Sequence, residues 1–301
     1  MMNQNRRDFL KTGTMALAGA TFLPNLDFRK KKIVGVQLYS VRADMKANPL
    51  STLTEIAKMG YKNVEHANYV DRKFYGWTAK EFRKVLDDLG LKMLSGHTVM
   101  GDNHWDDAKK DFTDKWKYTV EDAAICGQKY VISPSLPTEW YKTQDILKKY
   151  MAIFNKSGEL CQKSGMKFGY HNHHFEFAEK RDGIPVFDII LNNTDPKLVA
   201  QQLDIGNMYN GGAKAQDILT QFPNRFELMH VKDEVEAPAG SPDKYESSIL
   251  GVGLINVKEV IDLGKKMGNT KHFIVEQESY QGKKPLDSMR EDLAMMKKWG
   301  Y

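Results

Sequence analysis

Residues 159–173, ELCQKSGMKFGYHNH, contain the pattern that decides the fold. The first part has the apolar spacing of a helix. Gly165 stands where that helix would end, because glycine reaches the left-handed backbone conformation without a Cβ clash. A short, apolar, β-prone run then follows, as expected of a parallel strand that is buried on both faces. This strand ends in histidines, so the pattern places polar groups where a strand meets a loop.

The same unit of helix, glycine and strand recurs along the chain. It appears in EIAKMGYKNVEH (55–66), KVLDDLGLKMLSGH (84–97), EDAAICGQKYVISP (121–134) and, more loosely, IDLGKKMGNTKHFIVEQE (261–278). Eight strand candidates are found, at 33–38, 62–66, 92–97, 129–133, 167–171, 199–204, 225–231 and 272–278. This pattern predicts that residues 33–301 form a single (β/α)8 TIM barrel. A doubly wound sheet fits less well, because the first candidate strand is not followed by a glycine-rich fingerprint.

Residues 1–32 are predicted to be a twin-arginine export signal and linker. The basic segment NRRDFLK (5–11) precedes a mildly apolar run of small residues, with Ala18-Gly19-Ala20 near its end. Twin arginines, a weak hydrophobic region and an A-x-A site are typical of such signals. The alternative is a basic amphipathic helix. The signal predicts a periplasmic or secreted protein.

The charge of the chain argues against a nucleic-acid partner. Residues 1–32 hold seven Lys and Arg and two Asp. The whole chain holds 44 Lys and Arg and 39 Asp and Glu, so residues 33–301 hold 37 charged residues of each sign. A neutral body is a poor polyanion binder, since affinity for nucleic acid rests mainly on phosphate neutralisation.

No apolar run is long enough for a stable membrane span. Two cysteines argue against a disulfide framework, although they could form a single disulfide bond with each other. The sequence does not determine the oligomeric state.

Polar, ligand-capable residues end most of the predicted strands. The carboxyl ends of barrel strands, together with the loops that follow them, form the active sites of TIM barrels. Seven repetitions of a polar end on an apolar strand are not a packing pattern, so these ends are expected to converge on one site. The residues are Glu65 and His66 on one strand, and His97, Ser133, His171, Asp204, His230 and Glu276 on the six others.

Four segments in the second half of the chain carry the strongest candidates for metal ligands. HNHHFEF, QLDIGN, LMHVKD and IVEQE supply Glu176, Asp204, His230 and Glu276 from four consecutive strands or their loops. Carboxylates combined with one imidazole form a mixed site suited to one divalent ion, Mn²⁺, Mg²⁺, Co²⁺ or Zn²⁺. Taken alone, each residue has a structural alternative; Asp204, for example, can cap the following helix.

The motifs YHNHHFEF, QLDIGN, HVKD, ILGVGLINV and IVEQE, in this order and spacing, resemble the sugar phosphate isomerase/epimerase family of xylose-isomerase-like barrels. The resemblance runs from about residue 33 to the C-terminus. It implies one divalent metal on a Glu-Asp-His-Glu set, which corresponds to Glu176, Asp204, His230 and Glu276. In epimerases of this superfamily the first glutamate ends the fifth strand itself, where Tyr170 or His171 stands here. Either the loop folds back to bring Glu176 to the metal, or a histidine, His171 or His173, replaces it.

The expected chemistry begins with removal of a proton next to a carbonyl that the metal polarises, which leaves an enediolate. Glu176 and Glu276 are the candidate bases, and His97 is a candidate proton relay. Aromatic residues in the loops suit the stacking of a sugar ring. The predicted substrate-binding residues are His171, His173, Glu65, Lys232, Glu278, Trp105 and Trp140.

These features predict an enzyme, a metal-dependent isomerase or epimerase of an unphosphorylated keto- or aldo-sugar. Loss of a β-substituent from the same enediolate makes a keto-glycoside lyase the second hypothesis. A non-catalytic sugar-binding barrel is the third, because the fold alone does not establish activity. An endonuclease of the same fold is disfavoured by the neutral charge. The segment DEVEAPAGSPDKYESSI (233–249) is predicted to be a mobile flap over the site.

Overall fold

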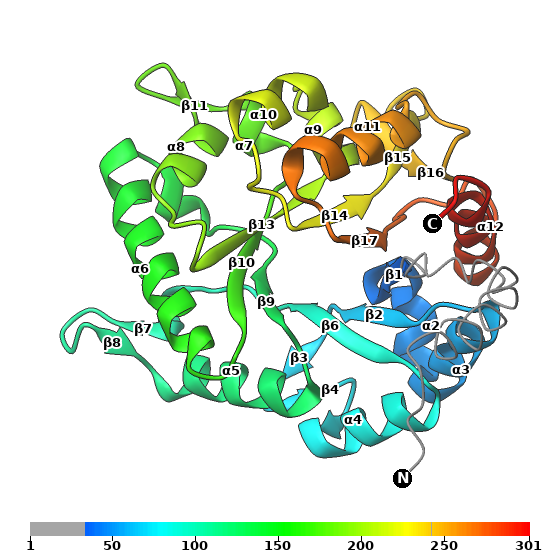
Figure 1. Ribbon diagram of the computed structural model, residues 1–301, viewed down its shortest axis with the longest axis horizontal. Helices are drawn as coiled ribbons and strands as arrows, with labels where there is room; N and C mark the ends of the chain where they lie inside the picture. Colours follow the sequence, from blue (N-terminus) through cyan, green and yellow to red (C-terminus); the bar gives the residue numbers. More distant parts are fainter. Residues whose placement is uncertain (1–33, 242) are drawn as a thin grey trace, which may run out of the picture. The chain divides into compact units, whose positions relative to one another are not determined.

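The predicted strands close into one parallel barrel in the computed structural model, which describes residues 34–241 and 243–301 (Figure 1). The barrel strands are β1 (Val34–Gln37), β2 (Asn63–His66), β6 (Lys92–His97), β9 (Tyr130–Ser133), β10 (Lys167–His171), β13 (Val199–Asp204), β14 (Leu228–Val231) and β17 (His272–Val275). They pair in the order β1-β17-β14-β13-β10-β9-β6-β2, and β2 closes on β1. The prediction of a single (β/α)8 barrel is confirmed. The predicted export signal lies outside the described residues and stays a prediction.

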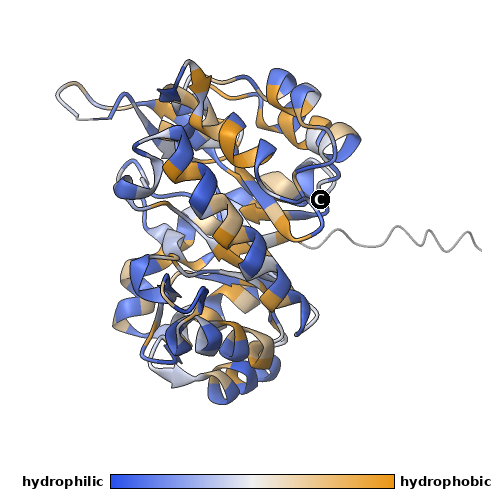
Figure 2. Cartoon of the chain, turned by 90° about the vertical axis from the view of Figure 1, so that its left-hand side faces the viewer, coloured by the Kyte–Doolittle hydropathy of each residue, from blue (hydrophilic) through white to orange (hydrophobic). Residues whose placement is uncertain are grey.

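Helices surround this barrel (Figure 1). Within the described residues they are α2 (Arg42–Ala47), α3 (Pro49–Met59), α4 (Ala79–Asp88), α5 (Asp114–Cys126), α6 (Gln144–Gln162), α7 (Phe175–Ala178), α8 (Val186–Asn192), α9 (Ile205–Asn210), α10 (Ala215–Gln221), α11 (Val257–Leu263) and α12 (Pro285–Lys298). In α6, Leu147, Met151, Phe154 and Cys161 are buried, a helical spacing that forms one apolar face. Figure 2 shows that the helices mix apolar and polar residues. Among the described helices, none has the length and apolarity needed to cross a bilayer.

Glycines follow the helices as predicted in four of the repeating units, whereas Asn269 takes the left-handed conformation in the looser unit at 261–278. Gly60 follows α3 with a φ of 109°, and Gly127 follows α5 with a φ of 83°. Both values lie in the left-handed region, where a side chain would be strained. Each glycine therefore turns the chain from a helix of the outer ring into the next strand of the barrel.

Small antiparallel hairpins lie within the loops between strands and helices. The segment predicted to be a flap forms a hairpin of β15 (Asp233–Glu236) and β16 (Tyr245–Ser248). Asp233 anchors the chain that follows β16, because its carboxylate accepts hydrogen bonds from the amides of Glu234, Gly251, Gly253 and Ile255. The other hairpins are β3 (Tyr69–Val70) with β4 (Lys73–Phe74) and β5 (Trp77–Thr78), β7 (Trp105–Asp106) with β8 (Asp111–Phe112), and β11 (Lys180–Arg181) with β12 (Ile184–Pro185).

A buried carboxyl on α12 is expected to make stability depend on pH. Burial raises the pKa of Asp292 from 3.8 to about 8, although the amide of Leu250, which donates to Oδ1 over 2.9 Å, opposes the shift. Between about pH 4 and 8 the folded chain keeps a proton that the unfolded chain has released. The free energy of unfolding therefore falls as pH rises through this window, by at most about 1.4 kcal/mol per pH unit.

Asp292→Asn keeps the acceptor for Leu250 and removes this titration. We expect the stability of the variant relative to wild type to increase between pH 5 and pH 8, as measured by urea unfolding. Asp287→Asn, at an exposed position of the same helix, is the control. A constant difference between Asp292→Asn and wild type across that range would contradict the assignment.

Candidate metal centre and active site

Four polar residues from strands β10, β13, β14 and β17 meet at the carboxyl end of the barrel. His171, Asp204 and His230 belong to the ends of their strands, and Glu276 directly follows β17. One ligand atom from each lies within 4.8 Å of those of the other three, and all four residues are buried. His230 Nδ1 is 3.1 Å from Glu276 Oε2 and 3.7 Å from Asp204 Oδ2, and His171 Nε2 is 3.9 Å from Asp204 Oδ2.

This group of four residues fits a divalent cation. Asp204 Oδ1 accepts a hydrogen bond from the amide of Asn207 over 2.7 Å and so caps α9, while Oδ2 is buried without a hydrogen-bond partner among the described residues. A buried carboxylate oxygen with no donor is costly unless a cation neutralises it. Two imidazole nitrogens and two carboxylates form the mixed donor set that Zn²⁺, Mn²⁺ and Co²⁺ accept. Asp204 thus caps α9 through Oδ1 and is a candidate metal ligand through Oδ2, the two roles that its sequence position suggests.

Hydrogen bonds on the far side of both histidines orient their rings. His230 Nε2 lies 2.5 Å from Glu65 Oε1, and His171 Nδ1 lies 3.1 Å from Gln202 Oε1. These contacts leave His230 Nδ1 and His171 Nε2 as the nitrogens that face Asp204 and Glu276. A carboxylate or carbonyl behind a metal-binding imidazole is the usual way in which proteins select its tautomer and hold the ring.

Glu65 is the centre of this supporting network. It is fully buried and accepts hydrogen bonds from Gln37, from Ser95 and, over 2.9 Å, from Gln202. Burial alone would raise the pKa of Glu65, but His97 and His230 outweigh it and hold this pKa well below its usual value. Glu65 does not line the pocket above the cluster. Its predicted role as a substrate-binding residue is therefore replaced by a supporting position behind His230.

Replacing Glu65 with glutamine is expected to weaken metal binding. The amide would place a donor at one of two oxygens that now only accept, either against His230 and Gln37 or against Ser95 and Gln202, so the network that anchors the ring is disrupted. Loss of such an outer partner typically lowers metal affinity by about 10- to 100-fold. Competition with a chromophoric chelator measures the change. Glu227→Gln, which alters a carboxylate held by Tyr130 and Lys167 at the opposite end of the barrel, is expected to leave affinity unchanged.

The cluster holds negative charge that requires a positive partner. Burial opposes the charged forms of His230 and Lys232, yet the carboxylates beside them raise both pKa values well above normal. Lys232 Nζ lies 3.2 Å from Glu276 Oε2 and 3.6 Å from Asp204 Oδ2, and it also binds Glu278. Positive charge is thus drawn to the space between Asp204 and Glu276, which is also the space between the candidate metal ligands.

Glu176 lies outside this group. Its carboxylate accepts hydrogen bonds from the hydroxyl of Tyr170 and, over 2.9 Å, from the amide of His173. The residue is fully buried in the short helix α7, and burial raises its pKa to about 7. The loop after β10 therefore does not bring Glu176 to the cluster, and His171 occupies the position that the predicted ligand was expected to take.

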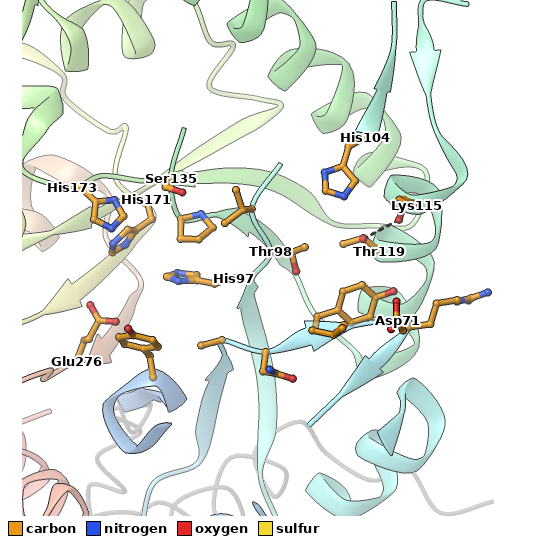
Figure 3. Close-up of a pocket in the computed structure, with 18 of the residues that line it drawn as sticks. Asp71, His97, Thr98, His104, Lys115, Thr119, Ser135, His171, His173 and Glu276 are labelled. Carbon is orange, nitrogen blue, oxygen red and sulfur yellow. Dashed lines mark hydrogen bonds between the residues drawn. The ribbon is translucent and has the colours of Figure 1, made fainter. Parts of the chain in front are cut away.

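A pocket of about 740 Å³ opens from the cluster. Figure 3 shows His97, His171, His173 and Glu276 gathered at one end of this pocket and Asp71, His104 and Thr119 at the other. His97 Nε2 lies 2.8 Å from Gln202 Oε1 and 3.1 Å from Glu65 Oε1. His173 Nδ1 is buried without a hydrogen-bond partner among the described residues. Glu278 also lines the pocket.

The two tryptophans predicted to bind substrate lie elsewhere. Trp140 is fully buried, stacks on Tyr150 with ring centroids 3.8 Å apart and donates to Asp102. Trp105 is half-buried against Phe112 in the β7–β8 hairpin. Neither lines the pocket. Aromatic residues in loops also pack those loops together, and composition cannot distinguish this role from substrate stacking.

Gln37, Ser95 and Gln202 support the cluster, and the sequence interpretation missed them. Their signal was a polar residue within a barrel strand: Gln37 in β1, Ser95 in β6 and Gln202, next to Gln201, in β13. Each is buried and hydrogen-bonded to Glu65. A buried polar side chain in a strand needs a partner, so this pattern could have indicated the network.

The chain belongs to the family of xylose isomerase-like TIM barrels, whose model matches residues 53–299. Inosose dehydratase from Clostridium beijerinckii is 26% identical over 193 residues, which cover 62% of this chain and 54% of that protein. The chain thus spans about half the length of the curated relatives it matches.

Solved structures show the same relationship. A sugar phosphate isomerase/epimerase from Parabacteroides distasonis superposes with a TM-score of 0.73 and 26% identity, covering 88% of this chain and 93% of that one. The IolI protein with a bound zinc atom superposes with a TM-score of 0.68 at 14% identity, over 88% of this chain and 97% of that one. The second likeness shows the fold alone. Inosose dehydratase and sugar phosphate isomerase/epimerase are names of enzymes, and the prediction that this protein is an enzyme is confirmed.

Proposed function

We propose that the protein is a metal-dependent carbon–oxygen lyase that acts on a keto-sugar or a related cyclic ketone. The observation that carries the proposal is the buried group His171, Asp204, His230 and Glu276 at the end of a 740 Å³ pocket. These residues would hold a divalent cation, which would polarise the substrate carbonyl and acidify the neighbouring C–H bond. The relationship to inosose dehydratases supports this class of reaction.

The relationship to inosose dehydratases favours elimination over epimerisation. Epimerisation removes a proton from one face of a carbon and returns one to the other, and so uses a base on each side. Here an imidazole, His171, stands at the end of β10, and Glu176 is turned away. Glu276 and His173 are the groups placed to move protons at the cluster end of the pocket.

The reaction balances with these two groups. One of them takes the proton next to the carbonyl, the electron pair of that C–H bond forms a C=C bond, and the C–O bond at the next carbon breaks. The other supplies the proton with which the oxygen leaves, as water or as an alcohol. Elimination, the second hypothesis from sequence, thus becomes the first.

Isomerisation or epimerisation of a sugar is the second candidate. It is favoured by the likeness to the sugar phosphate isomerase/epimerase from Parabacteroides distasonis, at 26% identity over most of both chains. Both candidates begin with the same proton removal and differ in what happens to the resulting carbanion.

Solvent isotope exchange and product analysis separate the candidates. The metal-loaded protein is incubated in D2O with a 3-keto-glucoside or a keto-inositol, and the products are examined by NMR and by absorbance of a conjugated enone. We expect deuterium exchange together with an unsaturated ketone. Exchange with only an epimer or isomer would establish the second candidate, and no exchange under any metal would contradict both.

His173→Ala assigns the proton transfers. Loss of both exchange and product would make His173 the base, and exchange without product would make it the acid for the leaving oxygen. An unchanged variant would remove His173 from the mechanism.

We further propose that the protein is exported to the periplasm or beyond. The support is the twin-arginine segment at Arg6 and Arg7 and the run that follows it. Fractionation of cells that express the full chain or its Arg6→Lys, Arg7→Lys variant tests this, and an equal distribution of the two would contradict it.

A further inference from the structure

A second cavity, of about 450 Å³, adjoins the pocket above the cluster. Its walls come from the 3-10 helix η1 (Leu38–Val41), from α2 and the start of α3, and from the segment after β2. Tyr39, Ala67 and Asn68 line both cavities. The volume lies within the range of about 300–1,000 Å³ that is typical of small-molecule sites. A substrate whose reacting ring lies at the cluster therefore has room to extend past these three residues into the second cavity.

Both charged side chains that line the second cavity are cations. They are Arg42 and Lys46, one turn apart on α2. Neither forms an ion pair with a carboxylate among the described residues, although Asp44 lies between them on the same helix. The pocket above the cluster, in contrast, is lined by side chains of both signs. The second cavity thus offers positive charge that no ion pair within the described chain neutralises.

Arg42 is held in position by uncharged acceptors. Its Nη1 donates to the backbone oxygen of Tyr39 over 3.2 Å and to the hydroxyl of Tyr280 over 3.1 Å, and its Nη2 donates to the backbone oxygen of Glu278 over 3.1 Å. The guanidinium also lies 4.6 Å from the ring centroid of Tyr39. A guanidinium has five N–H groups, so two of them have no hydrogen-bond partner among the described residues. A cation fixed in this way loses little side-chain freedom when it binds an anion.

Uncharged donors line the same cavity. The hydroxyl of Tyr75 accepts a hydrogen bond from the amide of Ala67 over 2.9 Å and keeps its own O–H for donation. The side chain of Asn68 is exposed and forms no hydrogen bond among the described residues. Two cations with a hydroxyl and an amide beside them form a donor set that suits the oxygens of a carboxylate or a phosphate.

We propose that the cavity at Arg42 and Lys46 is a subsite for an anionic group, a carboxylate or a phosphate, carried by a second sugar unit of the substrate. The inference deepens the proposed function, on which it rests for the first sugar unit at the metal cluster. The substrate would be an acidic keto-disaccharide. Elimination breaks the C–O bond between the units, the first unit keeps its carbonyl and gains a C=C bond, and the second leaves as an alcohol with one proton.

Binding of three unreactive disaccharides to the metal-loaded full chain tests the subsite apart from the reaction. The first is methyl cellobioside, and the other two carry a carboxylate or a phosphate at C6 of the unit that bears the methyl group. All three lack the ring ketone that elimination requires, and calorimetry gives their dissociation constants. We expect an anionic compound to bind at least about tenfold more tightly than the neutral one, which is the typical effect of one hydrogen bond to a charged group.

The two anionic compounds distinguish the source of the charge. Tighter binding of the carboxylate would identify a uronic acid unit, and tighter binding of the phosphate would identify a phosphorylated sugar. In either case the preference is expected to fall as salt is added, because salt screens exposed charges. Equal affinities of all three compounds, tighter binding of the neutral one, or no binding of either anion would overturn the proposal.

Neutral substitutions locate the effect. Arg42→Gln and Lys46→Gln are each expected to remove most of the preference for the anionic compound and to retain the metal. Lys80→Gln makes the same change of charge at an exposed position of α4 outside both cavities and is the matched control. An equal loss in the control would overturn the assignment. An anion preference without deuterium exchange on a keto-sugar would retain the subsite and reject the proposed reaction, and exchange without the preference would do the reverse.

Discussion

Replacing His230 with alanine is expected to abolish stoichiometric metal binding and to lower kcat/KM on the order of a thousandfold or more. The ring stands between Glu65 Oε1 at 2.5 Å and Glu276 Oε2 at 3.1 Å, so its loss removes a metal ligand and the contact that orders the network behind it. A bound cation stabilises developing charge by several kcal/mol, and each ~1.4 kcal/mol is a factor of ten in rate.

The same substitution removes one partner from each of two buried carboxylates, Glu65 and Glu276, and breaking a buried ion pair costs on the order of 3–5 kcal/mol of stability. Thermal unfolding must therefore accompany the assays, at a temperature where the variant is folded. The matched control is His272→Ala, at the first residue of β17 and the opposite end of the barrel, where the ring contacts only Tyr130 among the described aromatic rings. It is expected to keep its metal and its activity. A folded His230→Ala protein with full metal content would contradict the assignment.

The second large effect distinguishes His171, the last residue of β10, from Glu176 in α7. His171→Ala is expected to lower metal affinity by at least about 100-fold, which is the upper end of the effect of removing an outer partner. Glu176→Gln is expected to retain the metal affinity of the wild type. The reason is geometric: His171 Nε2 faces Asp204 Oδ2 at 3.9 Å, while the carboxylate of Glu176 is occupied by Tyr170 and the amide of His173.

Glutamine at position 176 keeps one oxygen that can accept from the amide of His173, and its NH2 group can donate to the hydroxyl oxygen of Tyr170, so Glu176→Gln is a conservative control for the fold of this segment. Metal titration of both variants by calorimetry gives the comparison. The reverse result, with affinity lost in Glu176→Gln and kept in His171→Ala, would mean that the loop folds back onto the metal.

The fold was predictable because its information is local and repeated. A helix that ends in glycine and is followed at once by a buried strand specifies one βα unit, as at Gly60 and Gly127, and eight units close a barrel. The strand ends could be predicted as a group for the same reason. Since all parallel strands of a barrel end on one face, His171, Asp204, His230 and Glu276 had to lie near one another.

The details that could not be predicted depend on contacts between distant segments or on the path of a loop. Whether Glu176 returns to the cluster depends on a turn whose sequence allows both outcomes, and here Tyr170 and the amide of His173 hold the carboxylate away. Trp140 shares its loop composition with sugar-binding aromatic residues, yet it stacks on Tyr150, which α6 brings beneath it. The role of Glu65 became visible only when β2 and β14 were placed across the barrel from one another.

The measurement that tests the central claim most directly is the metal content of the purified full chain, combined with anomalous diffraction at the absorption edge of the metal found. Plasma mass spectrometry after incubation with Mn²⁺, Co²⁺ or Zn²⁺ gives the stoichiometry, and the diffraction locates the ion. The predicted result is about one divalent ion per chain, bound between His171, Asp204, His230 and Glu276. No bound metal, or an ion bound to other residues, would contradict the site and the lyase chemistry that rests on it.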